Sequence, residues 1–160
     1  AAAATEMHQF WRHLALAGLI EGTYSGTASG GTNSASVVPG TNSPRSKLSN
    51  AGWGTGGGGN CGSTACFYFG TTNFGPVYGN YLVLGAQQAD NTPLVAVLKA
   101  EEAWNIDTKI DDGRPALGKV MPIWQAANAC TTSTSVTDTA GNYNLSNSNI
   151  QCAMYFVQAY

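Results

Sequence analysis

Three aspartates near the end of a predicted helix are the residues in this sequence best suited to chemistry. Asp107 and Asp111 are one helical turn apart and so share a face, and Asp112 follows directly. Together with the backbone carbonyls that come after them, these carboxylates offer an oxygen shell of the kind that Ca²⁺ accepts. Calcium is therefore one predicted ligand, and the sequence indicates no other cofactor.

The same carboxylates also have a structural interpretation, which we favour. A helix presents partial negative charge at its C-terminus, so acids in the last turn need compensation. We expect Asp111 and Asp112 to accept hydrogen bonds from backbone N–H groups of the turn at residues 113–118, or to pair with a nearby cation. The predicted turn residues are Gly113, Pro115 and Gly118, and the candidate cations are Lys109, Arg114 and Lys119.

The four cysteines are better explained as disulfides than as metal ligands or nucleophiles. Their spacings match no common zinc pattern, and no histidine lies near them in the sequence. Four cysteines allow three connectivities, of which two local bridges are the simplest, Cys61 to Cys66 and Cys130 to Cys152. Closing the second loop would stabilise the fold by about 3 kcal/mol in the chain-entropy model. Disulfides imply an oxidising compartment.

Other functional classes find little support. The sequence has no nucleophile elbow and no zinc-protease motif, and His8 and His13 are expected at the surface, so we predict that the chain is not an enzyme. Its seven Lys and Arg residues are scattered and the net charge is -2, which argues against nucleic-acid binding. A run of glycines at 56–59 lacks the strand and the Lys-Ser/Thr of a phosphate loop.

The sequence predicts two helices. The first begins at Thr5 as N-cap and carries an apolar stripe, with Gly18 near its end. The second begins near Lys99 and ends at Gly113, with apolar residues at helical spacing. The apolar positions are Met7, Phe10, Trp11, Leu14 and Ala17 in the first helix, and Ala103, Ile106 and Ile110 in the second, with Trp104 beside them.

Between these helices the sequence predicts a long loop followed by short strands. Residues 23–60 are dominated by Gly, Ser, Thr, Asn and Pro, which is typical of an irregular loop. Aromatic and β-branched residues then indicate strands at 66–69, 81–84 and 94–98, the last paired back on 81–84. After the second helix come a strand at 119–124, in which Pro122 indicates an edge position or a bulge, and a central strand at 151–157.

This order predicts a single α+β domain over residues 1–160, with an antiparallel sheet and long loops. Aromatic residues near the glycine-rich loop either form a small core beneath it, which we favour, or a surface that binds a glycan or another surface ligand. They are Trp53, Phe67, Tyr68, Phe69, Phe74 and Tyr78.

Three segments resemble bacterial type IV pilins and type II secretion pseudopilins. They are FWRHLALAGLIEG at 10–22, IDTKIDDGRP at 106–115 with GKV at 118–120, and CAMYF at 152–156. The resemblance spans residues 6–22 and 79–157 and leaves the glycine-rich loop uncovered. Family members begin with a leader and a long apolar helix; the longest apolar run here, at 14–20, is too short to be that helix. A shortened chain is the simplest explanation.

The resemblance implies a pilin-like head, with a helix on an antiparallel sheet and a C-terminal disulfide that closes a variable surface loop. It also implies self-association with pilin-like subunits, an extracellular or periplasmic location on a bacterial filament, and a membrane link only through an upstream helix. We therefore expect a structural filament subunit acting in assembly and in surface display or secretion. The alternative is a secreted, non-enzymatic binding module for carbohydrate or surface adhesion that does not polymerise.

Overall fold

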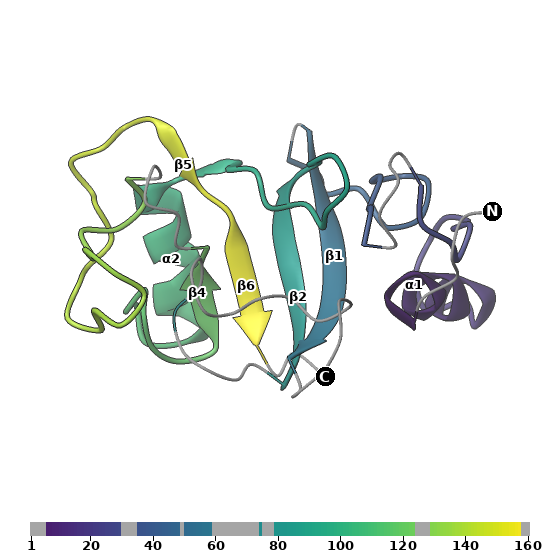
Figure 1. Cartoon of the computed structure of the whole chain (residues 1–160), viewed down its shortest axis with the longest axis horizontal. Helices are drawn as coiled ribbons and strands as arrows, with labels where there is room; N and C mark the ends of the chain where they lie inside the picture. Colours follow the sequence, from purple (N-terminus) through teal and green to yellow (C-terminus); the bar gives the residue numbers. More distant parts are fainter. Residues whose placement is uncertain are drawn as a thin grey trace.

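A computed structural model describes residues 6–29, 35–48, 50–58, 74, 79–123 and 129–157 of the chain. Within them, two helices and two antiparallel sheets form the predicted α+β arrangement (Figure 1). The elements in chain order are α1 (Glu6–Leu16), β1 (Ala51–Gly58), β2 (Gly79–Ala86), β3 (Leu98–Lys99), α2 (Ala100–Ile110), β4 (Val120–Pro122), β5 (Ile150–Cys152) and β6 (Met154–Val157). No helix among the described residues is long and apolar enough to cross a membrane.

The larger sheet has four strands in the order β1-β2-β6-β4, all antiparallel. The predicted central strand at 151–157 is confirmed in its second half, because β6 lies between β2 and β4. Of the two interpretations of Pro122, the edge position is confirmed, since among the described strands β4 pairs with β6 alone. Proline has no N–H group to donate to a neighbouring strand. An edge strand tolerates it, because one side of the strand has no partner.

Two sequence predictions about strands are wrong. The glycine-rich end of the predicted loop, residues 51–58, is β1, which pairs with β2 along its full length. The segment 94–98 does not pair with 81–84: Val95 makes one bridge to Ala86, and Leu98 pairs with Cys152 in the small β3-β5 sheet. The strand predicted at 66–69, and Trp124 in the predicted strand 119–124, lie outside the described residues.

The two faces of the larger sheet carry separate apolar clusters. One includes Leu84, Val120 and Met154 from the sheet and Ala100 and Ala103 from α2. The other face buries a second cluster: Phe74, Tyr81, Val83, Ala116, Met121, Ile123, Ala153, Tyr155 and Val157. Helix α2 packs against β3, β4 and β5, whereas α1 lies at the far side of β1 (Figure 1). The predicted helix-on-sheet packing is therefore made by α2.

The helix faces are only partly as predicted. In α1 the buried residues are His8 and Trp11, so the expectation that His8 lies at the surface is wrong, while His13 is exposed. In α2 the buried face consists of Ala100, Ala103 and Asp107, whereas Ile110, the last residue of the helix, is 61% exposed. Thr5, the predicted N-cap of the first helix, lies outside the described residues.

Candidate functional site

The three predicted aspartates do come together where α2 ends, and we call Asp107, Asp111, Asp112 and residues 113–120 the acidic corner. Helix α2 starts at Ala100, and the carboxylate of Glu102 in its first turn accepts the backbone N–H of Lys99 at 2.8 Å, as in a capping box. It ends at Ile110, and Gly113 follows with a φ of 72°. One carboxylate oxygen from each aspartate lies within 4.8 Å of those of the other two.

Backbone donors compensate these acids, as the structural interpretation predicted. Asp107 Oδ1 accepts the N–H of Gly113 at 3.1 Å, and Asp112 Oδ1 accepts that of Arg114 at 2.8 Å. Asp111 Oδ2 accepts the N–H groups of Lys119 and, at 3.2 Å, Val120. The three aspartates form no ion pair with a cation in the described part of the chain. The predicted turn residues Gly113 and Gly118 both have positive φ, and Pro115 is buried.

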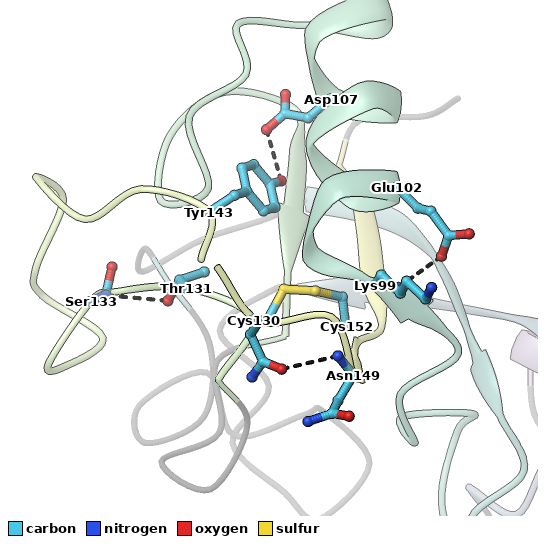
Figure 2. The surroundings of a disulfide bond; sticks show 10 residues. Lys99, Glu102, Asp107, Cys130, Thr131, Ser133, Tyr143, Asn149 and Cys152 are labelled. Carbon is cyan, nitrogen blue, oxygen red and sulfur yellow. Dashed lines mark hydrogen bonds between the residues drawn. A yellow bond between two sulfur atoms is a disulfide. The ribbon is translucent and has the colours of Figure 1, made fainter. Parts of the chain in front are cut away.

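Asp107 also receives a hydrogen bond that sequence reasoning missed. Tyr143, from the C-terminal loop, donates its hydroxyl to Asp107 Oδ2 at 2.8 Å, and both residues are buried (Figure 2). Burial raises the pKa of Asp107, the bonds from Tyr143 and Gly113 oppose that rise, and the charges of Asp112 and Asp111 add to it. Burial also raises the pKa of the Tyr143 phenol, and the Asp107 charge raises it further, so the phenol keeps its proton.

The loop that carries Tyr143 is closed by the Cys130–Cys152 disulfide, with 5.2 Å between the two Cα atoms (Figure 2). Both cysteines are buried in the same apolar cluster as Ala100 and Ala103. Near the disulfide, Thr131 and Tyr143 form an antiparallel bridge, and the Asn144 N–H donates to the Cys130 carbonyl at 2.9 Å. The predicted pairing of Cys130 with Cys152 is confirmed; Cys61 and Cys66 lie outside the described residues.

The geometry gives the acidic corner a structural role. Each aspartate already uses at least one oxygen to accept a hydrogen bond, and Asp107 uses both. The arrangement therefore fixes the exit from α2 to β4 and joins that exit to the disulfide-closed loop through Tyr143. Calcium binding stays a prediction; a chelator that lowers the thermal midpoint of unfolding would support it.

The signal that marks Tyr143 in the sequence is weak. It is the one aromatic residue between Cys130 and Cys152, in a stretch otherwise dominated by Ser, Thr and Asn. Such a residue is a reasonable candidate for a buried contact, but nothing in the sequence identifies Asp107 as its partner. Comparison with known protein families, with curated proteins and with solved structures gives no match to this chain.

Proposed function

We propose that the chain is the globular subunit of a pilus-like filament, either a type IV pilin or a type II secretion pseudopilin. The observation that carries the proposal is the disulfide-closed C-terminal region. Cys152 ends β5 and is separated from the central strand β6 by one residue, so the disulfide ties the loop at 131–151 directly to the sheet. A head of this kind combines a rigid sheet with a surface loop that can vary in sequence.

The loop has properties suited to display outside the cell. Its residues are mostly Ser, Thr, Asn and Asp, and most of them are half-buried or exposed. The disulfide and the bond from Tyr143 to Asp107 hold it at two places. A disulfide persists where the surroundings are oxidising, which is compatible with a secreted or periplasmic protein. The loop is thereby ordered without needing helices or long strands of its own.

Self-association would require an apolar surface, and the end of α1 provides one. Leu16, the last residue of α1, is 75% exposed, and Leu19, three positions further along the chain, is 71% exposed. Single exposed leucines are ordinary, but two strongly exposed leucines three positions apart are a candidate contact between subunits. In the proposed filament this pair packs against a neighbouring head, while the disulfide-closed loop faces solvent.

The proposal is tested on cells that produce the protein. Filaments sheared from the cell surface should contain the chain, as detected by an antibody raised against it. The double variant Leu16→Asp and Leu19→Asp should be missing from that fraction while remaining folded. A matched control is Leu145→Asp, because Leu145 is 52% exposed and belongs to the loop that should face solvent. A chain that never enters the sheared fraction and stays monomeric would count against the proposal.

A further inference from the structure

A groove lies beside β1, away from the acidic corner and the disulfide. Its lining comes from α1, residues 20–24 that follow it, the segment before β1, and strands β1 and β2. Figure 1 shows α1 beside β1, at the edge of the larger sheet. The volume of the groove is about 670 Å³, within the range of roughly 300–1,000 Å³ typical of small-molecule sites. Six of the residues that line it are Trp11, Glu21, Tyr24, Arg45, Trp53 and Leu82.

Three aromatic side chains contribute to the groove, and burial, ring packing or a hydrogen bond holds each of them. Trp11 is 6% exposed. The ring of Trp53 packs on that of Phe156, with centroids 5.7 Å apart and a tilt of 50°. Tyr24 donates its hydroxyl to the Glu21 carbonyl at 2.8 Å. Rings that are already fixed lose little conformational freedom when a ligand packs on them.

Two charged side chains in the lining are free to meet a ligand. Glu21 and Arg45 are exposed, and within the described residues neither side chain makes a hydrogen bond or an ion pair. Their charges are opposite and cancel, so the groove has no net charge from these groups. A planar guanidinium and a carboxylate are the groups that form paired hydrogen bonds with neighbouring hydroxyls.

These features restrict the chemistry of the ligand. An anion would meet Glu21, and a cation would meet Arg45, so a strongly charged ligand faces one repulsive partner. A wholly apolar segment would remove both charged groups from water without replacing their hydrogen bonds, which is costly. A neutral molecule with C–H faces for the rings and hydroxyls for Glu21 and Arg45 satisfies both requirements. Pyranose sugars have this combination.

We infer that the groove is a binding site for a neutral oligosaccharide. Trp53 and Tyr24 supply rings on which sugar C–H groups pack, and Arg45 and Glu21 bond the ring hydroxyls. This activity goes beyond filament assembly, and the groove is formed by a single subunit, so binding can be tested on the purified chain without filaments. Failure of the filament proposal would therefore leave this site intact, and the reverse also holds.

The test is a titration of the purified chain with three neutral probes, maltotriose, cellotriose and N,N′,N″-triacetylchitotriose, followed by calorimetry and NMR. At least one probe should bind saturably. Arg45→Ala and Glu21→Gln should each weaken its affinity by about tenfold or more. The controls are Lys47→Ala and Glu101→Gln, which change exposed charges outside the groove lining and should leave the affinity unchanged.

The aromatic contribution is tested separately. Trp53→Ala should abolish binding, whereas Trp104→Ala, on the exposed face of α2, should not. Trp53 also packs on Phe156, so Trp53→Ala could unfold the protein. In that case Arg45→Ala and Glu21→Gln, which change exposed side chains, test the binding site. Three outcomes would overturn the inference: no saturable binding of any probe, binding unaffected by Arg45→Ala and Glu21→Gln, or a groove occupied in solution by a second copy of the chain.

Discussion

At the scale of single residues, the most consequential contact joins Asp107 to Tyr143. A buried carboxylate without partners would be strongly unfavourable, and here Gly113 and Tyr143 provide one hydrogen bond to each of its oxygens. The pair connects two segments that are 36 positions apart in the sequence. Its loss should therefore affect both the acidic corner and the disulfide-closed loop.

We predict that Tyr143→Phe lowers the free energy of unfolding by about 1.5–3 kcal/mol, the usual contribution of a buried hydrogen bond to a charged group. Urea denaturation at neutral pH measures this directly. Tyr24→Phe is the matched control, because it removes a hydroxyl whose hydrogen bond is exposed, and its effect should stay within about 0.5 kcal/mol. Equal effects of the two variants would refute a special role for Tyr143.

The raised pKa of Asp107 predicts a pH dependence with a definite sign. An acid whose pKa is higher in the folded state binds its proton more tightly there, so its contribution to stability is greatest below the unfolded-state pKa of about 3.9. That contribution is lost as pH rises through the folded-state pKa. Asp107→Asn cannot ionise, so its stability relative to the wild type should improve as pH increases across this window.

Asp138 provides the opposite case within the same protein. Backbone N–H groups of Thr134 and Ala140 lower its pKa, so the stability that Asp138 contributes is present above its ordinary pKa and is lost as pH falls through the lowered value. The loss of stability that Asp138→Asn causes, relative to the wild type, should therefore be largest at neutral pH. Urea unfolding of Asp107→Asn, Asp138→Asn and the wild type from pH 3 to 8 measures both effects. If the stability of the two variants relative to the wild type changed with pH in the same direction, the opposite pKa shifts would be contradicted.

At the scale of elements, the sequence predicts some features well because local rules decide them. Helix α2 has apolar spacing at its start, an acid at its third position and Gly113 after its end, and it forms where expected. The edge strand β4 follows from Pro122 in the same way. These signals lie within a few residues of the structure that they specify, so no distant partner is needed to interpret them.

The glycine-rich strand β1 could not be predicted, because its cause lies elsewhere in the chain. Glycine weakens a strand, so local propensity indicates a loop. In the fold, a Cβ at Gly54 would lie 2.8 Å from both Pro93 Cδ and Val83 Cγ1, and one at Gly56 would lie 2.6 Å from Tyr81 Cζ. The glycines allow close contacts with β2 and with the segment after it, and only the tertiary structure shows those neighbours.

The acidic corner leads to a prediction that separates backbone conformation from packing. Gly18 and Gly118 both have positive φ, which costs any other residue about 1–2 kcal/mol. A Cβ at Gly18 would have no neighbour within 4 Å, whereas one at Gly118 would overlap the carboxylate of Asp111. Gly118→Ala should therefore destabilise the protein clearly more than Gly18→Ala, as measured by thermal unfolding. A smaller effect at Gly118 would show that Asp111 can move away without cost.

At the scale of the whole molecule, the disulfide should account for a large part of the stability of the C-terminal region. Replacing Cys130 and Cys152 together by alanine opens a loop whose ends are 22 positions apart. In the chain-entropy model the loss is about 3 kcal/mol. Urea unfolding of the double variant measures it, with the wild type in reducing buffer as a second comparison. A loss below about 1 kcal/mol would mean that the loop is held by its other contacts.

The central claim, that this chain is a filament subunit, is tested most directly by electron microscopy of native material with gold-labelled antibody against the chain. The proposal predicts gold particles at regular intervals along thin filaments, with the disulfide-closed loop accessible to an antibody raised against residues 131–149. Native material in which the chain occurs only as a monodisperse monomer, with filaments unlabelled, would contradict it.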